Sequence, residues 1–598
     1  MTASPPNEYA LRQRAREAEA EARERVHVRL GNAKVAIFIG IFAYWIVTLA
    51  RNPQAWVYGV AVAAFIALSV WHERVIRALA KANAAVAFYR DGIARIEDRW
   101  MRAEPSGERF RDANHPYADD LDIFGPRSLF QLLSGCRTPM GESRLAAWLL
   151  NPAPPTEIRA RQSRVDALRS RIDLRERVAV VDAGRRKLLL PDHLIAWAEQ
   201  PRTLPPLGPL VIFLALLFVA TFGNYFYGGS GWPVVAALAI NGSVFSALVK
   251  RANAIAEGLS SSTAATELDL LAAVVAEIER EQFDAPEISA LAARLVGGDD
   301  QPSASRGIAR LARVADWADS RHNVFLRIAD VPFLVTLQIA YAADRWRAGF
   351  GARLRDWVDA VGEMEALLSF AGYAYEHPAD PFPDVIAAHE PCFDAADMTH
   401  PLIAAAEAVR NALRICHGAG PQILVVSGSN MSGKSTLMRT VGVNAVLALA
   451  GAPVRASRMR LTHLAVGTCL RHTDSLQEHR SGFYTEALRI RRLFDLLDGP
   501  LPAMFLFDEL LSGTNSKDRR IAAEGVLSTM LERRAIGLVT THDLSLTEIA
   551  AMFPDRVKNV HLQDHVENGR MVFDYRLRDG VITHSNALEL MRMIGLDV

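Results

Sequence analysis

Long uncharged hydrophobic runs interrupt an otherwise charged, helical pattern in the first half of the chain. Two such runs follow each other near the N-terminus, and two more lie between Arg202 and Lys250. Each run is close to the ~20 residues that an α-helix needs to cross a hydrocarbon core, at ~1.5 Å rise per residue. The pattern therefore predicts two helical hairpins that each cross a membrane twice. The four runs are Val35–Ala50, Ala55–Trp71, Leu207–Phe226 and Trp232–Val249.

Positive residues mark the ends of these hairpins. Basic residues precede and follow the first hairpin, whereas its turn holds Arg51 alone, and Lys250 and Arg251 close the second hairpin. Because cytoplasmic flanks carry the excess of Lys and Arg, we expect a protein integral to the cytoplasmic (inner) membrane, with its N-terminus and C-terminal half in the cytoplasm. Buried hairpins in a soluble protein are the alternative, but they would not require positive flanks. No ionisable residue lies inside the runs, so they are expected to contact membrane lipid as anchors and not to line a transport path.

The pattern changes along the rest of the chain. Up to about residue 390 apolar residues recur at helical spacing, as at Leu268, Leu271 and Val275. From about Pro391 short apolar runs alternate with helices, which predicts an α/β domain with a largely parallel sheet. The runs expected to form strands are Ile423–Ser427, Leu461–Gly467, Ala503–Phe507, Ala535–Thr540 and Met571–Leu577.

Composition adds two limits. Lys+Arg and Asp+Glu balance at 67 each, so the net charge offers no argument for a nucleic-acid partner. The four cysteines, Cys136, Cys392, Cys416 and Cys469, are far apart and form no CxxC pair. We therefore expect neither a disulfide framework nor a zinc site, and a reducing compartment fits this pattern.

The segment Gly428–Ser435 has the GxxxxGK[ST] spacing of a phosphate-binding loop. It follows an apolar strand and precedes a helix, Thr436–Ala450, as such a loop requires. A chance glycine-rich turn would not need that context. Backbone N–H groups and the helix N-terminus would surround phosphate, Lys434 would reach the β- and γ-phosphates of ATP, and Ser435 would ligate Mg²⁺. The residues expected to bind ATP are Gly428, Ser429, Asn430, Met431, Ser432, Gly433, Lys434, Ser435 and Thr436.

Two further strand ends supply candidate catalytic groups. Asp508 and Glu509 follow the strand Ala503–Phe507, where Asp508 would hold Mg²⁺ and Glu509 would activate the attacking water. His542 ends another strand and could contact the γ-phosphate or that water. A helix N-terminus would also explain two adjacent acids, and a lone histidine at a strand end is often structural. The phosphate loop favours the catalytic interpretation of Lys434, Glu509 and His542.

Together these motifs resemble the ATPase domain of the MutS family, the DNA mismatch-repair proteins and their relatives. The loop with Asn430 and Met431, the Walker B segment Asp508–Thr514 and the His switch Thr541–Leu544 carry the resemblance. Arg480–Glu486 resembles the segment that presents a serine, here Ser481, to the nucleotide of the partner subunit. Gly482 stands where that family usually has threonine. The resemblance implies a homodimer whose two sites each take Ser481 from the other subunit.

The resemblance extends upstream, but with departures. Asp122–Gly125 and Thr138–Gly141 resemble the start of the MutS lever and core region. A short arm and a hairpin occupy the place of the N-terminal mismatch-recognition domain, which we expect this membrane-anchored variant to lack. The second hairpin falls about where the family inserts its DNA clamp, and Ala408–Asn411 offers no aromatic residue for adenine stacking.

The expected fold is multidomain. It combines four transmembrane helices, an all-α MutS-like lever and core region, and a C-terminal α/β P-loop ATPase domain of the ABC type. The expected segments are a charged arm, helical or disordered (1–34), hairpin 1 (35–71), a helical connector (72–117), lever and core helices (118–202), hairpin 2 (203–250), the continuing helical core (251–390) and the ATPase domain (391–598).

Three functions remain open at this point. The first is a membrane-anchored MutS-like ATPase whose ATP-driven dimer motion acts on double-stranded DNA, in mismatch repair or recombination. The second is a nucleotide-switched membrane scaffold for a protein partner, without DNA binding. The third, an ABC-type transporter, would need more spans and a polar path. Residues 157–187 are locally basic, which indicates either phosphate contact or, since acids are interleaved, a solvated helical face.

Overall fold

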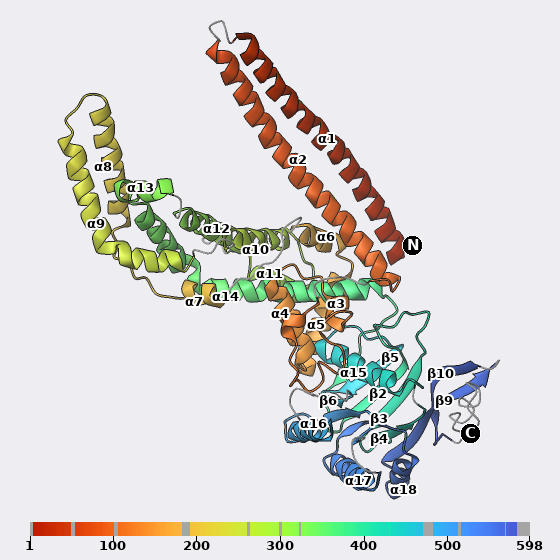
Figure 1. The fold of residues 1–598 in the computed structure, drawn as a ribbon. Coiled ribbons are helices and arrows are strands. Elements are labelled where there is room, and N and C mark those ends of the chain that lie inside the picture. Colours follow the sequence, from red (N-terminus) through yellow and green to blue (C-terminus); the bar gives the residue numbers. More distant parts are fainter. Residues whose placement is uncertain are drawn as a thin grey trace.

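A helical body carries two projecting hairpins on one side and an α/β domain on the other (Figure 1). The computed structural model describes residues 4–48, 54–100, 106–181, 192–259, 264–297, 302–321, 324–429, 431–470, 482–511, 516–567 and 570–582. Both hairpins extend away from the α/β domain, which contains the C-terminal part of the chain. The expected multidomain, mostly helical architecture with a C-terminal α/β domain is confirmed.

The N-terminal hairpin consists of two long helices, α1 (Pro5–Thr48) and α2 (Ala55–Ile96). The charged stretch expected as a separate arm is the first part of α1, and the expected connector begins as the last part of α2. Ion pairs one turn apart, such as Arg12–Glu8, stabilise the charged stretch as helix. Of the two expectations for this stretch, helix and disordered arm, the structure shows the helix.

The body is organised along α14 (Val335–Glu376), a helix of 42 residues. It is buried along most of its length, and helices from both sides of the second hairpin in the sequence pack against it. The other helices of the body are α3 (Leu129–Leu133), α4 (Pro139–Leu150), α5 (Pro155–Arg169), α6 (Ile172–Val180), α7 (Asp192–Ala198), α10 (Ala264–Glu279), α11 (Pro286–Ala293) and α12 (Ala304–Ser320), with the 3-10 turn η1 (Glu108–Phe110) before them.

A polar joint at the end of α14 holds the base of the first hairpin. The Tyr9 hydroxyl of α1 donates to the Glu376 carboxylate at 3.4 Å, and Arg95 Nε of α2 donates to the same carboxylate at 2.6 Å. Nearby, the Tyr89 hydroxyl donates to Glu176 of α6. Both carboxylates are buried, so their partners are needed to offset the cost of removing the charges from water.

The second hairpin pairs α8 (Gly208–Phe226) with α9 (Trp232–Glu257), and a third element joins it. This element is α13 (Val324–Phe333), which the sequence did not reveal as part of the hairpin. The rings of Phe218 and Phe333 meet edge to face with centroids 5.5 Å apart. The Asn241 amide donates to the Pro332 carbonyl at 2.8 Å. A bend of 76° then separates α13 from α14.

Four helices, α1, α2, α8 and α9, are long and apolar enough to cross a membrane, judged by length and composition. The described part of the chain would hold up to five such spans if the bent pair of α13 and α14 counts as one. In the apolar 18-residue stretch of each helix, only 6% is buried inside the protein for α1 and for α2, against 22% for α8 and 17% for α9. The hairpins are therefore not enclosed in a soluble core, which was the alternative from the sequence.

The described residues of the α/β domain form two sheets. The larger sheet has the order β10-β9-β4-β8-β7-β6, in which only the β9–β10 pair is antiparallel, so the prediction of a largely parallel sheet is confirmed. Its strands are β4 (Ile423–Ser427), β6 (Ala465–Cys469), β7 (Ala503–Phe507), β8 (Ile536–Thr541), β9 (Val557–Glu567) and β10 (Arg570–Asp579). The smaller sheet has the order β1-β5-β2-β3, with β1 (Asp384–Ile386), β2 (Cys392–Met398), β3 (Asn411–Cys416) and β5 (Arg458–Thr462). The helices are α15 (Lys434–Ala450), α16 (Gly482–Leu497), α17 (Ser516–Glu532), the 3-10 turn η2 (Leu544–Glu548) and α18 (Ile549–Met552).

Three expectations for this domain need correction. The single strand expected at 461–467 is two strands, because β5 ends at Thr462 in the small sheet and β6 starts at Ala465 in the large one. The small sheet extends before residue 391, the expected start of the domain, since β1 pairs with β5. The cysteines are not all unpaired thiols: Cys392 and Cys416 lie opposite each other on β2 and β3 and form a disulfide. Their separation in the sequence concealed a contact that strand pairing creates.

Gly351 sets the close approach of α14 to α7. A Cβ at this position would lie 2.1 Å from the backbone carbonyl oxygen of Ala198, which cannot rotate away. Gly351→Ala is therefore expected to lower stability by ~1–3 kcal/mol, measured as a lower thermal unfolding midpoint. The matched control is Gly349→Ala on the same helix, where nothing lies within 4 Å and the better helix propensity of alanine should stabilise slightly. Equal midpoints for the two variants would contradict this account of the helix contact.

Glu365 of α14 is a buried carboxylate that accepts hydrogen bonds from the start of α4. The backbone N–H of Arg137 donates to it at 2.9 Å, and the Thr138 hydroxyl donates as well. Burial nevertheless raises the pKa of Glu365 from its usual range to about 7, because these donors only partly oppose desolvation. This joint connects α14 to the start of α4.

Stability is expected to fall as pH rises from about 4.5 to about 7, because in this window the folded chain keeps the Glu365 proton that the unfolded chain has released. The contribution present at low pH is roughly 3 kcal/mol, and it is lost once pH exceeds the folded pKa. Glu365→Gln removes this titration. Unfolding midpoints measured across pH 4–8 should therefore show a shallower slope for the variant, and identical slopes would rule the assignment out.

Candidate nucleotide site

The loop expected to bind phosphate lies between β4, whose residues are all buried, and α15. Gly433 has a φ of +95° and precedes the helix, and a Cβ there would approach the Tyr575 ring of β10 to 2.8 Å. Glycine is needed at this position for both reasons. Met431 also has positive φ, 76°, and its side chain is 81% exposed at the tip of the loop. Asn430 lies outside the described residues.

Lys434 is buried at the start of α15 and points back into the loop. Its Nζ donates to the carbonyl oxygens of Gly428 and Ser429, both at 2.9 Å. Burial lowers the pKa of Lys434, and the nearby carboxylates of Glu509 and Asp508 oppose that shift. The ammonium group therefore lies in the loop and donates to two neutral carbonyl oxygens. Phosphate oxygens could take the place of these carbonyls and would form stronger, charge-assisted hydrogen bonds.

The loop hydroxyls also fit a phosphate ligand. Within the described part of the chain, the buried Oγ atoms of Ser429 and Ser432 have no hydrogen-bond partner. Buried hydroxyls are normally satisfied, so two open ones beside an ammonium group indicate a polar ligand. Thr436, in the first turn of α15, is exposed next to them.

Ser435 and Asp508 meet as the metal assignment requires. The Ser435 hydroxyl donates to Asp508 Oδ2 at 2.5 Å, and the Thr540 hydroxyl of β8 donates to Oδ1 of the same carboxylate. One hydroxyl and one carboxylate suit Mg²⁺, which takes few protein ligands and completes its shell with water and phosphate. The described residues contain no cluster of three or more His, Cys, Asp or Glu side chains that would hold a metal without such help.

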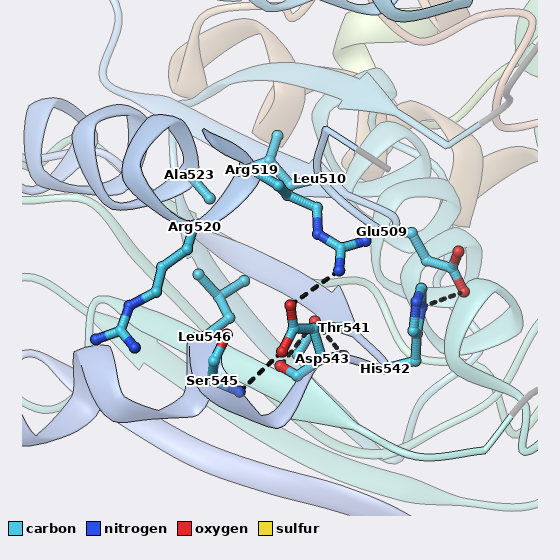
Figure 2. Close-up of a pocket in the computed structure, with 10 residues that line it drawn as sticks. All are labelled: Glu509, Leu510, Arg519, Arg520, Ala523, Thr541, His542, Asp543, Ser545 and Leu546. Carbon is cyan, nitrogen blue, oxygen red and sulfur yellow. Dashed lines mark hydrogen bonds and ion pairs between the residues drawn. The ribbon is translucent and has the colours of Figure 1, made fainter. Parts of the chain in front are cut away.

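Glu509 and His542 face each other from adjacent strand ends. His542 Nδ1 lies 3.4 Å from Glu509 Oε1, and Figure 2 shows the two side chains side by side at the edge of a pocket. Glu509 has a φ of 49°, a backbone conformation that is uncommon outside glycine and is often found at functional sites. Its backbone N–H donates to the Thr540 hydroxyl at 3.0 Å, which fixes its orientation.

The pocket beside this pair is formed by β8, η2 and α17 (Figure 2). Arg519 of α17 contacts Asp543 at 2.8 Å, and the Asp543 carboxylate accepts from the Ser545 N–H at 3.0 Å at the start of η2. Asp543 thus holds the segment that follows His542 in place. The pocket has both polar and apolar walls and opens next to Glu509.

The segment expected to serve the partner subunit is only partly described. Ser481 and residues 512–515 of the Walker B segment lie outside the described residues, whereas α16 begins at Gly482. Glu486 of α16 is buried and accepts from the Leu511 N–H at 2.6 Å. This bond ties the helix that follows Ser481 to the chain that follows Glu509.

Sequence reasoning missed three residues of this region. The Thr540 hydroxyl joins Asp508 and Glu509 by hydrogen bonds. In the sequence, only the Thr-Thr pair before His542 pointed to this residue. Asp120 accepts from the Leu470 N–H at 2.9 Å and so holds the end of β6 to the segment that precedes α3. Tyr575 contacts the phosphate loop from a bulge in β10, where its φ is 55°. The sequence could not bring β10 to the loop, because the contact depends on sheet order.

The comparison with known proteins concerns the domain that holds this site. Residues 424–597 match the family model of MutS domain V. The matched range begins in β4 and includes Lys434, Asp508, Glu509 and His542. The match thus supports the resemblance to MutS noted in the motifs over residues 424–597 of the α/β domain.

Curated MutS proteins are similar to this chain over part of their length. The DNA mismatch repair protein MutS of Myxococcus xanthus is 30% identical over 252 residues, which cover 41% of this chain and 27% of that protein. Endonuclease MutS2 of Thermus thermophilus is 32% identical over 198 residues, 33% of this chain and 25% of that protein. The match to MutS of Thermus aquaticus is 31% over 199 residues, with 33% and 23% covered. The chain therefore matches about a quarter of the length of these relatives.

Proposed function

We propose that this chain is a membrane-anchored, MutS-like ATPase that binds and hydrolyses ATP with Mg²⁺ to drive the conformational change of a homodimer. The supporting observation is the convergence of Lys434, Ser435, Asp508, Glu509 and His542 at neighbouring ends of β4, β7 and β8, in a domain that is MutS-like in sequence. Carboxyl ends of parallel strands are where α/β sheets bind ligands.

The residues have distinct roles in this proposal. Bound Mg²⁺ would supply positive charge beside the ATP phosphates. This charge would stabilise the negative charge that develops when the bond to the γ-phosphate breaks. Lys434 would exchange its two loop carbonyls for the β- and γ-phosphates, and Ser435 and Asp508 would hold the metal. Glu509 would accept a proton from the attacking water. His542, 3.4 Å from the Glu509 carboxylate, would keep that carboxylate and the water in position.

The dimer is part of the proposed site. Ser481 of one subunit would complete the nucleotide site of the other, and the Glu486–Leu511 bond would transmit its arrival to the Glu509 segment. Binding of ATP would close the two α/β domains on each other, and hydrolysis would release them.

Membrane anchoring through α1, α2, α8 and α9 completes the proposal and would place the protein in the cytoplasmic (inner) membrane. Two observations support this anchoring. The apolar stretches of these helices are little buried, and the helices project from the side of the body opposite the α/β domain (Figure 1). The N-terminus and the ATPase domain would lie in the cytoplasm. Carbonate extraction with protease mapping tests the anchors, and release of the chain by carbonate would refute them.

Double-stranded DNA is one candidate client, as the names of the relatives suggest, and a protein partner is the other. The basic stretch at 157–187 offers DNA little support. Arg164 pairs with Glu363 at 2.6 Å, Arg171 pairs with Asp284 at 2.7 Å, and Arg161 is buried. These side chains hold the helical body together. For them, the interpretation without phosphate contact is favoured. Residues 182–191 lie outside the described residues.

A gel-shift series on duplex, mismatched and branched DNA, at several salt concentrations and with or without ATP, separates the two clients. Binding that weakens steeply with salt supports DNA. No binding at low salt would remove DNA from the proposal and favour the nucleotide-switched scaffold.

A further inference from the structure

One face of α12 carries a row of arginines that the proposed ATPase does not use. Arg306, Arg310 and Arg313 are exposed at successive turns of this helix, and Trp317 continues the row with 60% of its surface exposed. The opposite face is apolar and buried, with Ile308 and Leu311 among its residues. We call Arg306, Arg310, Arg313 and Trp317 the α12 stripe.

Among the described residues, the arginines of the α12 stripe have no acidic partner within ion-pair distance. Across the described residues no ion pair reaches Arg306, Arg310 or Arg313, although Arg313 Nε donates to the Ala309 carbonyl of its own helix at 3.4 Å. Asp316 and Asp319 are exposed near the C-terminal end of α12, beside the stripe. Like charges one turn apart destabilise a helix slightly, so an external anion would relieve a repulsion built into this face.

The packing of α12 fixes the direction in which the stripe points. Gly307, a buried residue of α12, lies against Trp357 of α14, and its carbonyl accepts from Trp346 Nε1 at 2.7 Å. Figure 1 shows α12 on the side of α14 from which both hairpins rise, opposite the α/β domain. The helix that carries the stripe therefore lies on the side on which the proposed bilayer would lie.

The C-terminal end of α12 meets the second hairpin. Arg321, which follows α12, donates to the Asn253 side chain at 3.2 Å. Asn253 lies one turn beyond Lys250, the residue that ends the apolar run of α9. The chain then enters α13, which packs on α8 and α9 and leaves Ile328 73% exposed. Trp317 and Ile328 thus add exposed apolar surface towards the hairpin, among charged residues such as Arg327.

We infer that the α12 stripe is a membrane-surface contact that binds the headgroups of anionic lipids. The inference rests on the proposed anchoring, because the hairpins would bring the stripe to the bilayer. A basic helical face whose aromatic residue lies next to apolar surface is the composition of interfacial helices. Arginines within about a Debye length of ~8 Å are attracted by anionic headgroups. DNA offers phosphates too, but it would not explain Trp317 or the continuity with α13.

The test measures whether Trp317 contacts lipid. The full chain is reconstituted in bilayer discs of phosphatidylcholine with increasing phosphatidylglycerol, with bromine on the acyl chains as a fluorescence quencher. The contribution of Trp317 is the difference between the natural chain and Trp317→Phe. We expect bromine to quench this contribution when phosphatidylglycerol is present and much less in phosphatidylcholine alone.

The arginine variant supplies the decisive comparison. In Arg306→Gln/Arg310→Gln/Arg313→Gln the phosphatidylglycerol content for half-maximal quenching should rise by about fivefold or more, the effect of losing at least one favourable arginine–surface contact. The matched control, Arg491→Gln/Arg533→Gln/Arg534→Gln, removes three exposed arginines of the α/β domain and should leave it unchanged. Unfolding midpoints of both triple variants verify that they fold.

Three results would overturn the inference. Trp317 could be quenched equally in phosphatidylcholine alone, the triple variant could quench like the natural chain, or the variant could lose salt-dependent DNA binding while its quenching stays the same. The last result would assign the stripe to DNA. A chain that resists carbonate but shows one of these results contradicts this inference alone, whereas release by carbonate contradicts the anchoring itself.

Discussion

Lys434→Ala is expected to lower the turnover of ATP at least ~100-fold, because it removes a preorganised charge from the phosphates in the transition state. ATP binding should weaken as well, since Lys434 is the buried cation of the loop. Turnover is measured as phosphate release by the purified chain, and binding as fluorescence of a labelled ATP analogue.

The matched control for this variant is Lys558→Ala. Lys558 lies in β9 of the same sheet, is exposed and pairs with Asp579 at 2.7 Å, away from the loop. Its removal should leave turnover unchanged. If Lys434→Ala hydrolysed ATP at the natural rate while folding normally, the loop at Gly428–Ser435 would not be the site of catalysis.

Glu509→Gln is expected to lower turnover ~100-fold or more while ATP still binds, because glutamine keeps the shape of the side chain but cannot accept the proton of the attacking water. This separates it from Lys434→Ala, which should lose both. The dimer should consequently remain closed in ATP, which light scattering or crosslinking would detect.

Glu532→Gln supplies the control for the charge change, since Glu532 is exposed at the end of α17. A Glu509→Gln chain that turns over ATP normally would move the role of base to another group. A chain that binds no ATP would instead show that Glu509 positions the loop.

The parts of the fold that the sequence predicted well are those with a local signal. Strands β4 and β7 have the predicted bounds because each is a short apolar run closed by charged or glycine-rich residues. The four hydrophobic runs became helices for the same reason. The candidate site also followed from local motifs, since Lys434, Ser435, Asp508 and His542 all stand at strand ends or in the loop.

The missed features depend on distant partners. The disulfide of Cys392 and Cys416 requires β2 to pair with β3, and Tyr575 reaches the phosphate loop only because β10 lies at the sheet edge beyond β9. The segment at 461–467 has no internal signal for the change of sheet that divides it. The place of α13 on the second hairpin is set by Asn241 and Phe218, which are far away in the sequence.

The joint at Glu376 places the base of the long N-terminal hairpin at the end of α14, directly before the strands of the α/β domain. The 44 residues of α1 extend ~66 Å from this point at ~1.5 Å per residue. By simple geometry, a turn of ~5° at the joint displaces the far end of such a rod by ~6 Å, the ~5.4 Å of about one helical turn. Small angular changes in the α/β domain would therefore become displacements of molecular size at the opposite end of the hairpin. If lipid holds the far end of the hairpin in place, the same angular change would instead move the helical body and the α/β domain relative to the membrane.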